Sequence, residues 1–381
     1  MVPVGIQWQT GIVIEIVAAG EKLQEIVLET ADGDRCRAYH DLTAFAPLRP
    51  GDEVLANTTA VALGLGTGGA HFVLAPLAQV HSGGGPLPPG HIMKLRYTAL
   101  QRAVLAVEEA DSGMQEKLAG RSTLERMPVL IGELHSMLPA AVAWLRCRND
   151  GKQPVRIAYI MTDGAALPIA LSRHVDRLNA LGWLAGTITY GHAYGGDLEA
   201  VNKYTALLAA KHVLEADIAI VTMGPGIVGT GTPYGYTGIE TGELVNAVSA
   251  LGGIPVFMPR VSFGDARERH RGLSHHSITA LKTAALASAA VPLPLLSSPE
   301  QADILRDQAA SSRIADKHRI VWREAPSPDR MEAALCAYGA AITSMGRGWR
   351  DDPPFFAAVC TAADEALAGL AATRPAHGAE G

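Results

Sequence analysis

The chain has 381 residues, 48% of them hydrophobic, which is enough for two or three domains and a large buried core. Its 32 basic and 38 acidic residues give a formal net charge of -6, and no long run of either sign occurs. Non-specific binding to nucleic acid depends on a basic surface, so the composition argues against a nucleic-acid partner.

The cysteine content indicates a reducing environment. The four cysteines are far apart, and they form neither a C-x-x-C pair nor a short-spaced zinc pattern with histidine. The N-terminus is not a basic segment followed by an apolar one, and no uninterrupted apolar stretch reaches about 18 residues. We therefore expect a cytoplasmic protein with free thiols, without a signal peptide and without a membrane span.

Residues 1–80 are predicted to form a small all-β barrel domain. Its β-rich runs and turn signals are 11–17, 23–29, Asp32-Gly33, Pro50-Gly51, 52–57 and 71–74. Several short strands in one short segment are typical of a small barrel. Such barrels bind oligonucleotides through interleaved basic and aromatic residues, which this segment lacks. A structural role or the docking of a partner is therefore favoured over nucleic-acid binding.

A turn-rich linker at residues 81–91 separates the barrel from a larger domain at 92–370, and residues 371–381 are expected to form a flexible tail. In the larger domain, apolar runs alternate with helical patterns. The predicted strands are 102–108, 128–133, 156–162, 186–190, 218–223, 254–261 and 318–323, and the predicted helices are 114–120, 137–147, 167–181, 198–214, 240–251, 328–341 and 354–370. Asp197 is a candidate N-cap, and Gly182 is a candidate helix end. This alternation predicts an α/β fold: a mostly parallel, doubly wound, Rossmann-like domain of three layers.

Polar side chains directly follow several predicted strands. Ligands of an open parallel sheet bind outside the carboxyl ends of its strands, so we expect these side chains along one edge. His135, Asp163 and His192 are the candidate catalytic residues, because their side chains suit acid–base chemistry. Two of them have a structural alternative: His135 would cap the next helix, and Asp163 would form a turn with Gly164.

The longest glycine-rich segment, residues 221–238, follows a predicted strand and precedes a predicted helix. Its six glycines let the backbone approach a ligand closely. A loop of this length loses much chain entropy unless something orders it. We interpret it as a binding loop, in which the candidate ligand-binding residues are Gly224, Gly226, Gly229, Thr230, Gly231 and Thr232.

Residues 265–277 combine arginines and histidines just before a predicted helix. Ser274 is a candidate N-cap, and a helix N-terminus favours an anion and a neutral histidine. Arginine adds planar bidentate donors that suit carboxylate or phosphate. The candidate ligand-binding residues here are Arg267, Arg269, His270, Ser274, His275 and His276. The alternative is a solvated charged loop with internal Asp265/Arg269 and Glu268/Arg271 pairs.

Several familiar motifs are absent. Residues 224–229 imitate G-x-G-x-x-G, but proline stands in the second position and no acidic residue closes a following strand, so a dinucleotide site is not expected. No Walker A lysine, G-x-S-x-G elbow or H-E-x-x-H pair occurs. We therefore assign no cofactor and no metal ligand, although histidines at different strand ends leave a metal site open.

Eight segments carry a resemblance to a known family. They are Arg96-Tyr-Thr98, Leu134-His-Ser136, Met161-Thr-Asp-Gly164, Gly195-Gly-Asp197, Gly224-Pro-Gly226, Gly229-Thr-Gly-Thr232, Asp265-Ala-Arg-Glu-Arg-His270 and Ser274-His-His-Ser277. From the barrel to about residue 360, the chain resembles the bacterial family known as domain of unknown function 3866. Ala99 departs from the family pattern, which has proline there. The resemblance implies a soluble bacterial protein, and it carries no established reaction and no catalytic residues.

The residues favour a site for a small anionic molecule that bears phosphate or carboxylate, in an enzyme such as a hydrolase or a transferase. Two alternatives stay open. One is a non-catalytic ligand sensor or scaffold whose barrel docks a partner, and the other is a metal-dependent hydrolase. The sequence does not decide between an enzyme and a binding protein, and it leaves a homo-oligomer open.

Overall fold

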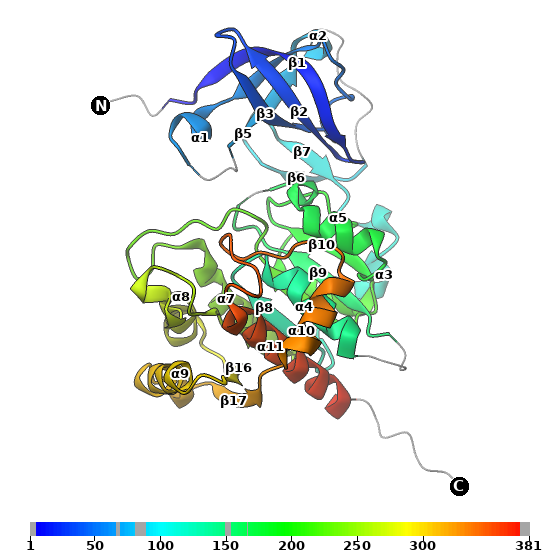
Figure 1. The fold of residues 1–381 in the computed structure, drawn as a ribbon. Coiled ribbons are helices and arrows are strands. Elements are labelled where there is room, and N and C mark those ends of the chain that lie inside the picture. The colour runs from blue at the N-terminus through cyan, green and yellow to red at the C-terminus, as the bar shows by residue number, and fades with distance from the viewer. Residues whose placement is uncertain (1–4, 66–68, 81–88, 149–153, 166, 374–381) are drawn as a thin grey trace. The chain divides into compact units, whose positions relative to one another are not determined.

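The computed structural model describes residues 5–65, 69–80, 89–148, 154–165 and 167–373 (Figure 1). The chain forms two compact units, Met1–Leu87 and Pro88–Gly381, and each is described here by itself. Most of the linker expected at 81–91 and of the tail expected at 371–381 lies outside the described residues.

The first unit is a closed barrel of five strands in the order β1-β2-β3-β5-β4. Its elements are β1 (Trp8–Ala19), β2 (Leu23–Thr30), β3 (Arg35–Asp41), β4 (Glu53–Asn57), α1 (Thr59–Ala62), β5 (Ala70–Pro76) and α2 (Leu77–Val80). β3 and β5 are parallel and the other neighbours are antiparallel, which is a Greek-key connectivity like that of OB-type barrels. The predicted barrel is confirmed.

Alternation along the strands gives the barrel its core. Val13 of β1 and the pair Ile26 and Leu28 of β2 are buried in one small apolar cluster. Two tight turns occur where the sequence predicts them. Gly33 and Gly51 have φ angles of +84° and +97° in these turns, a conformation that favours glycine.

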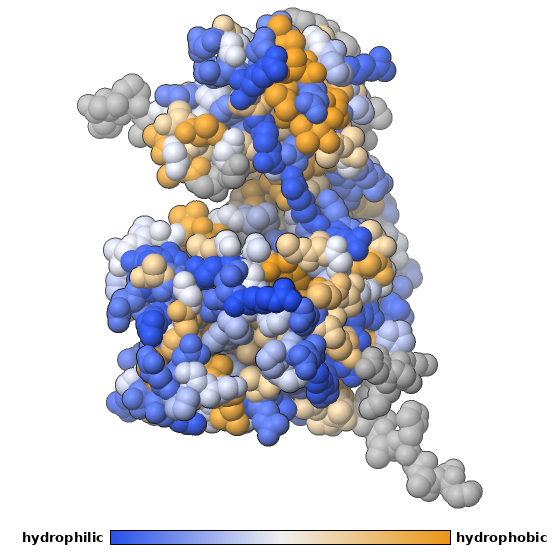
Figure 2. Space-filling view, in the orientation of Figure 1, coloured by the Kyte–Doolittle hydropathy of each residue, from blue (hydrophilic) through white to orange (hydrophobic). Residues whose placement is uncertain are grey.

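The barrel also exposes apolar surface. Ile12 and Val17 of β1 are 52% and 48% exposed, and apolar side chains gather on the face of the barrel seen in Figure 2. An open groove of about 680 Å³ lies on the same unit, with Trp8, Cys36 and His71 in its lining. These features are compatible with the docking of a partner, which stays a prediction.

The second unit is built on an eight-stranded sheet in the order β11-β10-β9-β12-β8-β13-β16-β17. Its strands are β8 (Pro128–Gly132), β9 (Ile157–Met161), β10 (Gly186–Tyr190), β11 (Leu198–Ala200), β12 (Ile218–Thr222), β13 (Ile254–Met258), β16 (Ala290–Leu295) and β17 (Arg319–Glu324). Every neighbouring pair in this sheet is parallel. The expected parallel sheet is confirmed, and so is the late strand expected near 318–323.

Helices cover both faces of this sheet (Figure 1). They are α3 (Gln115–Leu118), α4 (Met137–Arg148), α5 (Arg173–Ala180), α6 (Lys203–His212), α7 (Glu240–Ala250), α8 (His275–Thr279), α9 (Pro299–Ser311), α10 (Pro328–Ala337) and α11 (Pro353–Thr373). α4, α5, α10 and α11 share one core with Leu130 of β8, whereas α6, α7 and α9 share the other with Val129 and Ile131. Successive residues of a strand point to opposite faces, so strands covered on both sides are apolar throughout. The doubly wound, three-layer fold is confirmed.

The last helix is long and apolar because it lies in the core. Within the described residues, α11 alone has the length and composition of a membrane span. It packs on α4, β8, β13 and β16, and Phe355, Phe356 and Val359 are almost completely buried. Its apolar composition therefore has a structural explanation.

The strand predicted at 102–108 is shorter than expected and lies outside the parallel sheet. Arg102–Val104 forms β7, which pairs antiparallel with β6 (Ile92–Lys94) in a separate two-stranded sheet. Further on, Ala106 makes a single parallel bridge with Glu199. A short apolar run indicates a strand but does not indicate its partner, so the sequence pattern fits either arrangement.

The helix predicted at 198–214 is wrong at its start. Residues 198–200 form β11, and Asn202 caps α6 by accepting hydrogen bonds from backbone N–H groups of its first turn. Asp197 is therefore not the cap; its carboxylate accepts hydrogen bonds from the backbone N–H and the hydroxyl of Thr187, each at 2.8 Å. Gly182, with φ of +63° just beyond α5, is confirmed as a helix end.

β16 is absent from the sequence prediction because Pro292 and Pro294 interrupt its apolar run, and proline is rare inside strands. The sheet accommodates both. β16 forms six register pairs with β17, whereas its pairing with β13 is limited to Val256 and Ala290. Proline has no backbone N–H group to donate, which is compatible with the short pairing on the β13 side.

Two helical glycines should respond in opposite ways to alanine. A Cβ on Gly242 of α7 would lie 2.6 Å from both the backbone oxygen of Ala280 and the Cβ of Ala284, so Gly242→Ala should destabilise by about 1–3 kcal/mol. A Cβ on Gly369 of α11 would make an ordinary 3.4 Å contact with Pro128, so Gly369→Ala should stabilise by up to about 1 kcal/mol. Urea unfolding of both variants measures the difference, and equal effects would contradict the close packing on α7.

Candidate functional site

The connections after two neighbouring central strands leave on opposite faces of the sheet. The chain leaves β8 through α4 on one face and leaves β12 through α7 on the other. The strand order also reverses here, since β9, β10 and β11 lie on one side of β8 while β13, β16 and β17 lie on the other. Diverging connections open a crevice at the carboxyl ends of such strands, where ligands of open parallel sheets bind.

A cavity of about 150 Å³ lies among the loops that follow β12 and β13 and the segment before α11. Its wall is made by Ile227, Gly229, Thr230, Arg260, Arg267, Arg269, His270, His276 and Met345. Six predicted ligand-binding residues, from two loops that are far apart in the sequence, therefore share this wall: Gly229, Thr230, Arg267, Arg269, His270 and His276.

A buried guanidinium anchors the cavity. Arg260 is 3% exposed; its Nη1 lies 3.5 Å from Oε1 of Glu133, and its Nη2 donates to Oδ2 of Asp265 at 2.9 Å. Arg267 also donates to both carboxylate oxygens of Asp265, at 2.9 and 2.8 Å, and these bonds hold the pKa of Asp265 well below its usual value. The alternative Asp265/Arg269 pair is wrong, since Asp265 binds Arg260 and Arg267.

Arg269 differs from the other two arginines of the wall. Its Nε donates towards Nε2 of His270 at 3.4 Å, and a Cβ on Gly231 would lie 3.8 Å from its Nη1. Across the ranges that the structure describes, no acidic side chain pairs with it. The guanidinium of Arg269 is therefore available to a ligand next to the tip of the glycine loop.

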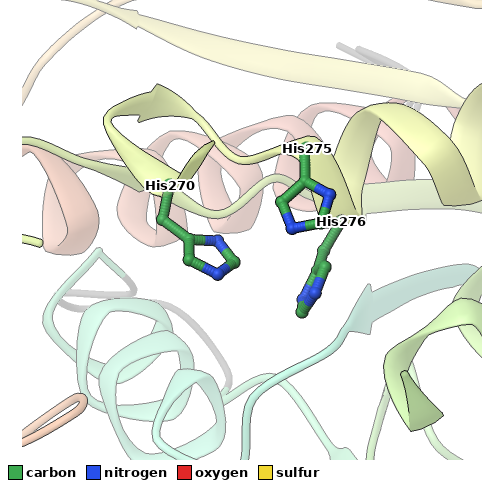
Figure 3. Close-up of side chains that lie close together, drawn as sticks. All are labelled: His270, His275 and His276. Carbon is green, nitrogen blue, oxygen red and sulfur yellow. The ribbon is translucent and has the colours of Figure 1, made fainter. Parts of the chain in front are cut away.

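Three imidazole rings, those of His270, His275 and His276, lie close together, as Figure 3 shows. Tyr236 stacks on His276 with ring centroids 3.8 Å apart, and its hydroxyl donates to the backbone carbonyl of His276 at 2.6 Å. The hydroxyl oxygen of Ser274 accepts from the backbone N–H of His276 and lies 2.8 Å from Nδ1 of His270. The predicted role of Ser274 as N-cap of α8 is confirmed, and His275 completes the group.

Burial and positive neighbours keep the three histidines neutral. Burial, together with nearby cationic groups, lowers the pKa of His270 and of His276 to about 3. Burial and the charge of Arg269 lower the pKa of His275. Burial also raises the pKa of the Glu133 carboxyl. At neutral pH the rings thus offer N–H donors and nitrogen lone pairs without charge.

The glycine loop folds back on itself as a short hairpin. Gly229 and Tyr236 form an antiparallel bridge, and the N–H of Thr230 donates to the carbonyl of Gly235 at 2.7 Å. The hydroxyls of Thr230 and Thr232 bond to each other at 2.8 Å, and that of Thr232 accepts from the N–H of Gly235. Thr232 therefore holds the tip of the loop, and it does not line the cavity.

Other glycines of the loop have structural explanations. Gly224 is buried, and a Cβ there would lie 2.9 Å from the sulfur of Met161. Gly226 has φ of +105°, a conformation that other residues rarely adopt. Neither residue lines the cavity. Close packing and backbone conformation account for these two positions without a ligand.

His135 belongs to a separate network. Its Nδ1 donates to the carbonyl oxygen of Met223 at 3.1 Å, so its Nε2 is the acceptor of a hydrogen bond from the Ser172 hydroxyl at 2.6 Å. Ser172 also caps α5 by accepting from the N–H of Val175. Burial, with a contribution from His174, lowers the pKa of His135 to about 4. These bonds join the end of β8 to the end of β12 and the start of α5.

The side chain of Asp163 contacts the backbone of His192, not its imidazole ring. Oδ1 of Asp163 accepts hydrogen bonds from the N–H groups of His192, at 2.6 Å, and Ala193, at 3.2 Å. Nδ1 of His192 accepts from the N–H of Leu95 at 2.9 Å. Like His135, both residues follow strands of the sheet, and none of the three lines the cavity. Their catalytic role stays a prediction.

Four residues of the site are not among the predicted ligand-binding residues. Glu133 follows β8 directly and Arg260 lies two residues after β13, so their position at strand ends is the signal that the sequence offers. Tyr236 belongs to the predicted binding loop at 221–238, and it supports the ring of His276. Met345 reaches the wall from the segment before α11, and no sequence pattern connects it with the site.

The fold and the site define a class of protein: a five-stranded barrel and an α/β unit with a doubly wound parallel sheet, whose carboxyl edge carries a cavity rich in arginine and histidine. The chain belongs to the family described as protein of unknown function (DUF3866), whose profile matches residues 35–363. The match includes parts of both units and confirms the resemblance seen in the sequence motifs. A comparison with curated proteins gives no match.

The neutral state of His135 predicts a loss of stability in acid. The pKa of this histidine is near 6.5 when unfolded and about 4 when folded, so the unfolded state binds more protons and the free energy of unfolding falls as the pH decreases from 6.5 to 4. One such group contributes up to about 1.4 kcal/mol per pH unit. His135→Asn keeps a donor for Met223, and it should be less stable at pH 7 but lose less stability in acid.

Urea unfolding at several pH values between 7 and 4 measures this slope. The control is His91→Asn, because the side chain of His91 is 84% exposed and its surface ion pair with Glu109 contributes little to stability, so the slope should change much less than in His135→Asn. A wild-type slope in His135→Asn would show that another group is responsible.

Proposed function

We propose that the cavity binds a small molecule through its phosphate or carboxylate group, and that the protein is an enzyme acting on this molecule, such as a hydrolase or a transferase. The supporting observation is the balance of charge: three arginines, Arg260, Arg267 and Arg269, stand against two acidic side chains, Asp265 and Glu133. The excess of guanidinium groups favours an anion.

The size of the cavity limits the group that it accepts. Its volume of about 150 Å³ lies below the range of about 300–1,000 Å³ that is usual for pockets of drug-sized ligands. A single phosphate or carboxylate group suits this volume. The rest of the ligand would extend past Gly229 and Thr230, which are exposed.

The histidines of the wall support a chemical role as well as binding. With pKa values of about 3, His270 and His276 are weak bases but good neutral N–H donors. A neutral imidazole can stabilise negative charge that develops on a reacting group. Both ring nitrogens of His276 are buried without a hydrogen-bond partner within the described chain. A bound ligand would supply the missing partner.

A non-catalytic sensor or scaffold is the second candidate. The open groove of about 680 Å³ and the exposed apolar side chains of the barrel favour a docking role for the first unit. Screening phosphate esters and carboxylate esters for turnover separates the two candidates. Binding of an anion without turnover of any member of these classes would favour the sensor.

The cytoplasm is the proposed setting. All four cysteines are free thiols in the structure, although Cys336 is exposed. Exposed free thiols persist in reducing compartments, whereas disulfides are common in oxidising ones. The thiol chemistry therefore supports a reducing location.

Arg269→Gln should weaken the binding of sulfate or phosphate by about 10-fold or more, because a hydrogen bond to a charged group contributes about 1.5–3 kcal/mol. Isothermal titration calorimetry in the presence of EDTA measures the affinity of the metal-free protein. Arg271→Gln is the matched control, since Arg271 is two residues away and pairs with Glu300 at an exposed position. Absence of anion binding by the wild type, or equal losses in both variants, would contradict the proposal.

A further inference from the structure

We propose that His270, His275 and His276 bind one divalent transition-metal ion, with Glu133 as an outer carboxylate. The three histidines come from α8 and the short turn before it, and Figure 3 shows their rings grouped around one small space. The site shares His270 and His276 with the wall of the cavity but requires no anionic ligand. The binding of a metal ion can therefore be tested separately from the proposed function.

The spacing of the rings fits a single ion. Zinc lies about 2.0–2.1 Å from imidazole nitrogens, which places ring centroids about 3 Å from the ion and about 4.5–5 Å from one another at tetrahedral or octahedral angles. The observed centroids are 5.0 Å apart for His270 and His275, 4.8 Å for His270 and His276, and 4.4 Å for His275 and His276. One nitrogen of each ring already lies within 4.8 Å of the others. Ring rotations can therefore direct three nitrogens at one ion without a change of the backbone.

The nitrogens that such an ion needs are available. Nε2 of His275 and both ring nitrogens of His276 are buried and have no hydrogen-bond partner in the described ranges. In His270, Nδ1 is engaged by Ser274, so Nε2 is the ligand atom; its contact with Arg269 is long, at 3.4 Å, and easily displaced. Buried polar atoms without partners are uncommon in folded proteins, and one ion would satisfy all three rings.

Oxygen atoms behind two of the rings are placed to orient them. Oε2 of Glu133 lies 3.6 Å from Nδ1 of His276, and the hydroxyl of Ser274 lies 2.8 Å from Nδ1 of His270. Histidines that bind metals usually donate their other ring N–H to such an oxygen, which fixes the ring and strengthens its lone pair. Glu133 and Ser274 are thus positioning residues, and Nε2 is the ligand atom in both rings.

The ligand set selects the class of metal. Imidazole nitrogens suit zinc, cobalt, nickel and copper, whereas magnesium and calcium prefer oxygen. The three arginines of the cavity oppose a cation, and the carboxylates of Glu133 and Asp265 offset part of their charge. Three protein ligands leave at least one coordination position open for water or for an oxygen of an anion, as in catalytic zinc sites and unlike structural ones.

Metal titration of the full-length protein tests this proposal. The protein is stripped with a chelator and titrated with Zn²⁺ and Co²⁺ in a buffer free of phosphate and sulfate. We expect one ion per chain, visible Co²⁺ absorption from a site with fewer than six ligands, and no binding of Mg²⁺ at the same concentrations. His275→Gln should lower the zinc affinity by about 100-fold or more, and Glu133→Gln by about 10-fold.

His275→Gln is the decisive variant, because His275 is only half-buried and Ser274 still caps α8. Thermal unfolding should show a zinc-dependent rise in Tm for the wild type and for the control His91→Gln, but not for His275→Gln. Zinc binding that is absent in the wild type, or unchanged in His275→Gln, overturns the proposal. The metal titrations contain no phosphate or sulfate, and the anion titrations contain EDTA, so the failure of one proposal leaves the other intact.

Discussion

The candidate site depends on the burial of one guanidinium. Arg260 follows a central strand, and it contacts Glu133 at the end of the neighbouring strand and Asp265 in the loop that leads to α8. Because it is 3% exposed, its charge requires these partners; removing one partner of a buried ion pair costs about 3–5 kcal/mol. The pairing holds the arginine- and histidine-rich loop onto the carboxyl edge of the sheet. Arg267 donates to the same Asp265 carboxylate, so one acidic group positions two of the three arginines of the cavity.

The same burial sets the protonation state of the histidines. Imidazolium rings would repel the arginines and lose their hydration, so His270 and His276 are neutral over the physiological range. A neutral ring has both an N–H donor and a lone pair, and the two atoms point in different directions. An anion beside Arg269 and a metal ion among the rings are therefore compatible occupants of one site. An oxygen of the anion could complete the coordination of the ion.

Much of the fold and part of the site could be predicted from local patterns. Apolar runs of four to six residues between helical patterns indicate buried parallel strands, and Ser274 is a helix cap by its position alone. The errors lie where local and tertiary signals compete. Pro292 and Pro294 hide β16, and Asp197 has the residue type of a cap but bonds to Thr187 across the sheet edge. The catalytic candidates His135, Asp163 and His192 follow strands as expected, yet their bonds join loops to one another and none of the three lines the cavity.

The sequence by itself determined most of the strands and helices, because periodicity and caps are properties of neighbouring residues. It also indicated that polar residues gather at one end of the sheet. Only the tertiary structure decided which strand ends are adjacent. The order β12-β8-β13 places Glu133 next to Arg260 and the glycine loop next to His276, whereas His135 turns towards α5. Strand order and burial are set by contacts between residues far apart in the chain. The pairing of charges, and with it the neutral state of the histidines, follows from those contacts and from no local pattern.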